Sequence, residues 1–302
     1  MYFTICIPAY NRAYTILRTL DSIKMQVFDS YEVLIIDDGS TDNTQETVMQ
    51  YIKENELANK FQYFYKENGG KHSALNLGIE KAKGIFFMIL DSDDWLAENA
   101  LQNLHVHCKK IEHNDEFCGI MGKSVNSEDG KIIGDLFDLK ESVSSYFDYH
   151  FIMPQKIFVN DCFEANKTKI LKKYRFPEEL GMRFVPEAWM FDQIGVKYKL
   201  LLTNEVFQLK EYLDDGITKD RDFKKKNARG FLYHYISRIE NVLPKKKMHF
   251  KQSLKLQMGS WYRYWQCVKL DVNNQGPRIK HITLIGYITK IMYPLISYII
   301  KE

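Results

Sequence analysis

The chain has 302 residues, enough for one large domain or two modest ones. Its composition, with 45% hydrophobic and 27% charged residues, is that of a globular protein and excludes a low-complexity or disordered chain. The net charge of +3 hides an asymmetry: acidic residues outnumber basic ones by 34 to 24 in 1–218, whereas basic residues outnumber acidic ones by 18 to 5 in 219–302.

The cysteines indicate a reducing compartment. They are five in number and scattered, and no two of them form a Cys-x-x-Cys pair. This pattern suggests neither a zinc site nor a disulfide framework. The first residues enter an apolar strand without a basic leader, so we expect no signal peptide and a cytoplasmic protein.

The first 112 residues alternate between strand and helix patterns. Short apolar runs predict strands at 4–8, 31–36, 61–65 and 86–90. Apolar residues at helical spacing predict helices at 12–25, 43–55, 73–82 and 97–112. Such alternation is typical of parallel strands with helical crossovers, and therefore of an α/β fold.

Three carboxylates follow the strand at 86–90. An apolar strand buried on both faces cannot enclose unpaired charges, so Asp91, Asp93 and Asp94 must emerge at its carboxyl end. Clustered oxygen ligands suit a hard divalent cation such as Mg²⁺ or Mn²⁺. The alternative is that these residues only cap the next helix, which fits Asp94 best.

Other polar loops follow neighbouring strands. They are Pro8–Asn11, Asp37–Ser40 and the Gly69–Ser73 turn. Since the crossover rule places such loops along one edge of the sheet, we expect them to meet the Asp91–Asp94 loop there.

The pattern is less regular after residue 112. We expect a strand at 117–122, a hairpin or loop at 126–134, and helices at 167–174 and 187–194. The segments 199–203 and 206–209 predict strands of a second, smaller sheet. Residues 135–160 yield no assignment.

The basic C-terminal part predicts long helices over 219–242 and 248–269, interrupted at Leu243-Pro244. We therefore divide the chain into a domain at 1–218 and a basic, aromatic-rich helical region at 219–302. The apolar segment 282–300 contains Lys290 and is short for a membrane span. Two interpretations stay open: a helix lying on an anionic membrane surface, or a helix packed on its own domain.

Four motifs in this order resemble family-two glycosyltransferases, which have the GT-A fold. The motifs are Pro8-Ala9-Tyr10-Asn11, Ile36–Asp42, Asn68-Gly69-Gly70-Lys71 leading to Ala74–Gly78, and Asp91-Ser92-Asp93-Asp94. The resemblance covers about residues 2–212. It implies a Rossmann-like mixed sheet flanked by helices, with a helical C-terminal extension.

The resemblance also implies the roles of individual residues. The nucleotide-sugar would be bound by Pro8, Tyr10, Asn11, Asp38, Lys71, Asp91 and Ser92. Asp93, with Asp91 as a possible second ligand, would hold the Mn²⁺ or Mg²⁺ ion.

The family inverts the anomeric centre and needs a carboxylate to take the proton from the acceptor hydroxyl. Glu187 matches the usual position of this base, although Ala188 replaces the second acid of the commoner Glu-Asp pair, and Asp192 is the reserve. The segment 212–218 resembles a segment that follows the catalytic core in bacterial members of the family, which would form a lid over the donor.

The resemblance therefore implies an inverting, metal-dependent hexosyltransferase of bacterial surface polysaccharide biosynthesis. Its donor would be a UDP-sugar, and its acceptor a saccharide or a polyprenyl-diphosphate-linked sugar, reached at the inner face of the cell membrane. The main alternative is a non-catalytic glycan-binding module on the same fold. A nucleotidylyltransferase lacks support, because Pro8–Arg12 is not a glycine-rich loop, and we expect no nucleic-acid partner.

Overall fold

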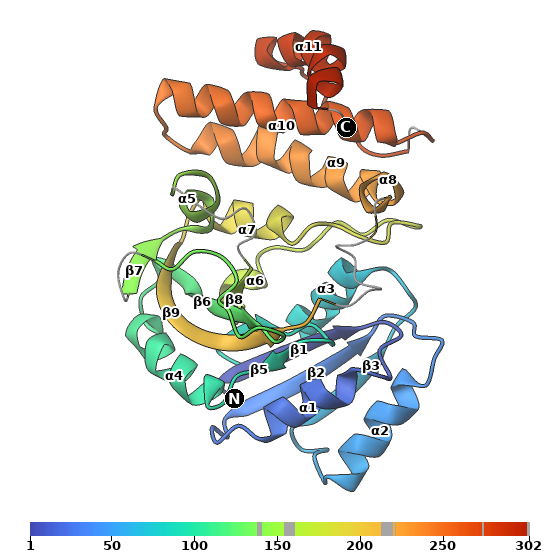
Figure 1. Cartoon of the computed structure of the whole chain (residues 1–302), viewed down its shortest axis with the longest axis vertical. Coiled ribbons are helices and arrows are strands. Elements are labelled where there is room, and N and C mark those ends of the chain that lie inside the picture. The colour runs from blue at the N-terminus through green and yellow to red at the C-terminus, as the bar shows by residue number, and fades with distance from the viewer. Residues whose placement is uncertain (138–140, 154–160, 213–219, 221, 274, 301–302) are drawn as a thin grey trace.

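The computed structural model describes residues 1–137, 141–153, 161–212, 220, 222–273 and 275–300. The strands of this part form one mixed sheet, with helices on both faces (Figure 1). They are β1 (Phe3–Ala9), β2 (Tyr31–Asp37), β3 (Phe61–Tyr65), β4 (Phe86–Ile89), β5 (Trp95–Leu96), β6 (Phe117–Asn126), β7 (Glu141–Ser144), β8 (Cys162–Lys167) and β9 (Lys199–Lys210). Their order is β3-β2-β1-β4-β8-β6-β9-β5, and β7 pairs with β9.

The parallel half of the sheet confirms the α/β expectation. Strands β3, β2, β1 and β4 are parallel neighbours, and β8 then pairs with β4 in the antiparallel sense. The connections are α1 (Ile16–Lys24), α2 (Thr44–Glu54) and α3 (Lys71–Lys81). Because these strands all run the same way, the loops that follow β1, β2 and β4 emerge at one edge of the sheet.

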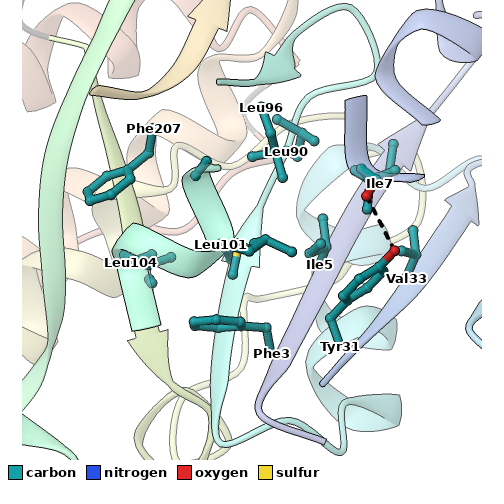
Figure 2. Close-up of a cluster of buried hydrophobic side chains, with 14 of the residues drawn as sticks. Phe3, Ile5, Ile7, Tyr31, Val33, Leu90, Leu96, Leu101, Leu104 and Phe207 are labelled. Carbon is teal, nitrogen blue, oxygen red and sulfur yellow. Dashed lines mark hydrogen bonds between the residues drawn. The ribbon is translucent and has the colours of Figure 1, made fainter. Parts of the chain in front are cut away.

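Strand β1 lies at the centre of the core and alternates between its two faces. Phe3, Ile5 and Ile7 pack on the side of α1, α2 and α4 (Ala100–Ile111), in the cluster drawn in Figure 2. Cys6 points to the opposite side, into a second cluster that contains Leu75 of α3. Two buried layers therefore fix the sheet edge that carries the loops.

The prediction of a second, smaller sheet is wrong. Residues 199–210 form one continuous strand, β9, which pairs in parallel with β6 and belongs to the main sheet. The register shifts between Met121 and Ser124 of β6, so β9 bends across the polar segment 203–205 instead of ending there (Figure 1). The sheet reaches the cleft again through the end of β9.

Three short helices lie between residues 146 and 194. They are α5 (Tyr146–Phe151), α6 (Thr168–Leu171) and α7 (Ala188–Ile194). The helices predicted at 167–174 and 187–194 thus correspond to α6 and α7. Strand β8 and helix α5 were not predicted.

The C-terminal helices stack on the side of the molecule that carries α5 and α7 (Figure 1). They are α8 (Phe223–Lys226), α9 (Ala228–Ser237), a π-helical turn at Arg238–Val242, a 3₁₀ turn at Leu243–Lys245, α10 (Phe250–Leu270) and α11 (Leu284–Ile300). A separate apolar cluster that includes Leu232, Trp261 and Tyr264 holds them together. Among the described residues, no helix combines the length and apolar character needed to cross a membrane.

Candidate active site

A cleft of about 960 Å³ opens at the carboxyl edge of β1, β2 and β4. It brings together the loops that the sequence singled out, as the crossover rule predicts. The residues nominated for the nucleotide-sugar and the metal that line it are Pro8, Tyr10, Asn11, Asp38, Lys71, Asp91, Ser92 and Asp93.

The loop Asp91–Asp94 is fixed from two sides. Asp94 is buried, and its Oδ2 accepts hydrogen bonds from Gln208 Nε2 (2.8 Å) and Lys210 Nζ (3.0 Å) at the end of β9. Arg18 on α1 donates to the carbonyl oxygen of Asp93 at 2.8 Å. Asp94 therefore serves the loop rather than the next helix, and its burial raises its pKa to about 7, although Lys210 acts in the opposite direction.

Lys71 joins the metal motif to the candidate base. Its Nζ lies 2.6 Å from Asp91 Oδ1 and 2.8 Å from Glu187 Oε1. Lys71 is the first residue of α3 and Glu187 directly precedes α7, so two helix starts converge on Asp91. Burial alone would lower the pKa of Lys71, but the two carboxylates raise it above its usual range, and the lysine stays charged.

Asp91 and Asp93 differ in their electrostatic surroundings. Burial acts to raise the pKa of Asp91, but Lys71 and Lys210 hold it below its usual range. The pKa of Asp93 is raised, first by burial and then by the negative charge of Asp91. A cation beside Asp93 would relieve this accumulation of negative charge.

The residues fit a divalent metal that takes most of its ligands from the substrate. No group of three or more His, Cys, Asp or Glu side chains in the described ranges is placed to hold a metal ion. However, Mg²⁺ is commonly held by one or two carboxylates together with substrate phosphates and water. Asp93, with Asp91 beside it in the cleft, offers that oxygen set.

Asp38 mainly organises the neighbouring turn. Its carboxylate accepts hydrogen bonds from Gly69 N (2.9 Å), Gly70 N (2.6 Å) and Lys66 Nζ (2.7 Å). These contacts hold the turn that leads into Lys71, and Gly70 adopts φ +90°, which favours glycine. Asp38 thus lies in the cleft wall with much of its capacity to accept hydrogen bonds already used.

Tyr10 and Asn11 follow β1 and have different surroundings. Tyr10 is 47% exposed at the cleft, where its ring is accessible to a ligand. Asn11 has φ +53°, and its Oδ1 accepts a hydrogen bond from Thr41 N at 2.8 Å. Asn11 therefore ties the loop after β1 to the loop after β2.

Asp192, the reserve base, lies away from the cleft lining. It is buried, and its Oδ2 lies 2.8 Å from Arg238 Nε in the C-terminal helices. This ion pair gives Asp192 a role in joining α7 to the C-terminal region. Of the suggested lid, Tyr212 lines the cleft, and residues 213–218 lie outside the described part.

Several cleft residues were not predicted from the sequence. They are Arg12, Asp161, Arg183, Phe184, Lys210, Glu211, Phe223 and Asn227. Lys210 Nζ lies 3.1 Å from Asp161 Oδ2, and the carboxylates of Asp91, Asp161 and Asp94 raise its pKa against the effect of burial. The sequence signal for Lys210 was its position at the end of an apolar strand, which the misassigned second sheet concealed.

The fold and the cleft at the sheet edge are those of a transferase of the GT-A type, and the comparison with family models agrees. The chain belongs to glycosyl transferase family 2, whose model matches residues 4–176.

The relatives are bacterial glycosyltransferases. An uncharacterized glycosyltransferase of Rickettsia bellii is 33% identical over 130 residues, which are 43% of this chain and 18% of that protein. Glycosyltransferase GlyG of Streptococcus pneumoniae is 28% identical over 223 residues, 67% of this chain and 68% of GlyG. The chain thus spans under a fifth of the first relative and about two thirds of the second.

Solved structures show the same fold. Staphylococcus aureus TarS 1–349 in complex with UDP superposes with a TM-score of 0.58 at 17% identity, covering 100% of this chain and 92% of that chain. The mannosyltransferase PcManGT from Pyrobaculum calidifontis, in complex with GDP-Man and Mn²⁺, gives 0.58 at 18% identity, covering 98% and 80%. At these identities the likeness establishes the GT-A fold alone.

Proposed function

We propose that this glycosyltransferase is a metal-dependent, inverting hexosyltransferase that uses a UDP-sugar. The observation that carries the proposal is the ion-pair chain from Asp91 through Lys71 to Glu187, since it links the candidate base to the loop that would hold the metal. The UDP and UDP-GlcNAc complexes of TarS support the choice of nucleotide.

In this proposal each side of the cleft has its own task. Tyr10 contacts the nucleotide base, and Lys71 supplies positive charge near the diphosphate. Glu187 takes the proton from the acceptor hydroxyl as that oxygen attacks the anomeric carbon from the face opposite the leaving group. We assign the base to Glu187 rather than Asp192. Asp192 is buried in an ion pair with Arg238 away from the cleft, whereas Glu187 pairs with Lys71, which lines the cleft.

Asp93 and Asp91 would hold the Mn²⁺ or Mg²⁺ ion. When bound, such an ion neutralises the charge of the leaving nucleotide diphosphate. The Mn²⁺ complex of PcManGT and the electrostatic environment of Asp93 support this assignment.

We propose that the acceptor is a saccharide, free or linked to polyprenyl diphosphate, in the assembly of a bacterial surface polysaccharide. Residues 1–218 would act as the catalytic domain, and 219–302 would hold it at the cytoplasmic face of the membrane. The excess of basic residues in 219–302 and the exposed apolar residues of α11 support this location.

The test is the slow hydrolysis of nucleotide sugars without acceptor. The purified chain is incubated with UDP-, GDP- and dTDP-sugars, with Mn²⁺ or with EDTA, and released nucleotide is quantified. We expect release from a UDP-sugar that EDTA and Asp93→Asn abolish, whereas the exposed-site control Asp129→Asn keeps it. Metal-dependent binding without any turnover, even with saccharides added, would favour the glycan-binding module, and absence of binding to every nucleotide sugar would refute the proposal.

A further inference from the structure

Part of the cleft wall comes from outside the sequence motifs. Arg183 and Phe184 lie in the loop before α7, whereas Phe223 belongs to α8 and Asn227 precedes α9. The C-terminal region therefore contributes directly to the cleft and is not only a neighbour of the catalytic sheet.

The aromatic side chains of this wall support one another. The rings of Phe184 and Phe223 meet edge to face, with centroids 4.7 Å apart. Phe231 of α9 lies against both, at 5.7 Å and 6.3 Å. Phe184 and Phe223 are half-buried and line the cleft. They therefore present apolar surface to the cleft while their rings pack on Phe231.

Two glycines allow close packing of the loop that carries Arg183 and Phe184. A Cβ at Gly70 would lie 1.9 Å from Arg183 O, and a Cβ at Gly230 would lie 1.7 Å from Phe184 O. The loop backbone is thus in close contact with the donor-side turn on one flank and with α9 on the other. Glu187 follows Phe184 by three residues, so the same contacts position the proposed base.

This wall has the composition of a sugar subsite. The apolar C–H face of a pyranose packs on aromatic rings, and its hydroxyls need nearby donors and acceptors. Arg183 supplies donors, and the amide of Asn227 supplies both kinds of group. We propose that Phe184 and Phe223, with Arg183 and Asn227, form the acceptor subsite and bind a pyranose ring beside Glu187. This assignment rests on the proposed function, because it takes the motif side of the cleft as the donor site.

The experiment measures saccharide binding and UDP binding separately. Binding of methyl and p-nitrophenyl pyranosides is followed by saturation-transfer-difference NMR, and UDP with Mn²⁺ by calorimetry. Phe223→Leu keeps the apolar bulk without the aromatic face, and Phe223→Tyr restores the ring. Phe250→Leu, at an 80% exposed position on α10, is the matched control.

We expect the wild type to bind at least one pyranoside. Phe223→Leu should raise the dissociation constant of that pyranoside by about five- to tenfold. Phe223→Tyr and Phe250→Leu should retain wild-type affinity, and the affinity for UDP should change less than twofold in Phe223→Leu. A parallel Phe184→Leu variant should repeat the loss.

Three results would overturn the assignment: no pyranoside bound by a wild type that binds UDP, equal saccharide affinity in all variants, or loss of UDP and saccharide affinity together in Phe223→Leu. The last result would place the wall in the donor site. Failure of the wild type to bind any nucleotide sugar would instead refute the proposed function, and pyranoside binding that depends on Phe223 would still be measurable in that case.

Discussion

Glu187 and Asp192 lie on the same helical segment but have opposite surroundings. Glu187 forms an ion pair with Lys71, which lines the cleft, whereas Asp192 is buried against Arg238. We predict that Glu187→Gln lowers the rate of sugar transfer by about a hundred- to ten-thousand-fold, the usual contribution of a general base, with little change in the melting temperature.

Asp192→Asn is the contrasting variant. It leaves the Arg238 charge buried without its partner, so the free energy of unfolding should fall by about 3 kcal/mol while the surviving folded enzyme still transfers sugar. Urea titrations and initial rates on both variants decide the assignment. A large loss of rate in folded Asp192→Asn, with full activity in Glu187→Gln, would exchange the two roles.

Burial of His72 is expected to make the stability of the protein depend on pH. It is 1% exposed, and burial lowers its pKa to about 4 from its usual value near 6.5. Between these values the unfolded chain binds a proton that the folded protein does not, so this stabilising contribution is present above pH 6.5 and is lost as the pH falls towards 4.

We therefore predict that His72→Leu flattens the decline in stability over this range by up to about 3 kcal/mol. Denaturant titrations from pH 7 to pH 4.5 would measure it. His113→Leu, at an exposed position, should leave the slope unchanged. Equal slopes in His72→Leu and the wild type would show that His72 becomes protonated in the folded state.

At the scale of the elements, helix α9 depends on one glycine for its contact with the loop before α7. A Cβ at Gly230 would overlap the backbone of Phe184, whereas a Cβ at Gly259 of α10 would meet nothing within 4 Å. We predict that Gly230→Ala lowers the free energy of unfolding by about 2 kcal/mol and reduces activity, because the loop leads to Glu187.

The matched variant Gly259→Ala should raise the free energy of unfolding by about 0.5–1 kcal/mol, since alanine is the better helix former. Thermal unfolding of both variants gives the comparison. If Gly230→Ala were as stable as the wild type, the contact between α9 and the loop would have to be adjustable rather than fixed.

The elements also show what the sequence could and could not predict. The four parallel strands were predictable, because each is a short, mainly apolar run and a helical pattern follows each of them along the chain. Strand β8 was missed because Cys162–Lys167 mixes apolar residues with Glu164, Asn166 and Lys167. Their partners are distant in sequence: Lys167 donates to Asn114 O at 2.6 Å, and Asn166 bonds Tyr146. Local periodicity carries no information about such contacts.

The same distinction applies to the cleft. Residues in loops after parallel strands could be grouped in advance, since topology alone brings these loops to one edge. Lys210, Phe223 and Asn227 come from a bent strand and from the C-terminal region, and they reach the cleft only through tertiary packing. The sequence motifs therefore predict the side of the cleft formed by the loops after β1, β2 and β4. They do not predict the wall that contains Phe223 and Asn227.

At the scale of the whole molecule, α11 packs on the C-terminal helices, as one of the two interpretations of segment 282–300 expects, and the membrane-surface interpretation stays a prediction. One face packs on α10, where Trp265 Nε1 donates to Gly286 O at 3.1 Å and Lys290 lies 5.0 Å from the centre of the Trp265 ring. The other face exposes an apolar stripe at helical spacing, formed by Leu284, Tyr287, Ile288, Ile291 and Leu295. Lys290 therefore does not belong to the stripe, whose five residues are all apolar.

This arrangement favours a bilayer surface as the partner of the stripe. A helix whose apolar face is exposed beside basic residues lies in the membrane interface and is attracted by anionic lipids. We predict that the protein sediments with vesicles containing phosphatidylglycerol, less with phosphatidylcholine vesicles, and less at high salt, because salt screens the attraction. The double variant Leu284→Ser/Ile291→Ser should lose most of this binding.

The control for the vesicle assay is Met25→Ser/Val27→Ser, which removes equally exposed apolar side chains from the far end of the molecule, after α1 (Figure 1). It should sediment like the wild type. Light scattering in the absence of lipid separates the competing explanation, since a second copy covering the stripe would give a dimer that Leu284→Ser/Ile291→Ser dissociates. A monomer whose lipid binding depends on both the stripe and the anionic charge would support the proposed attachment of the C-terminal region to the membrane surface.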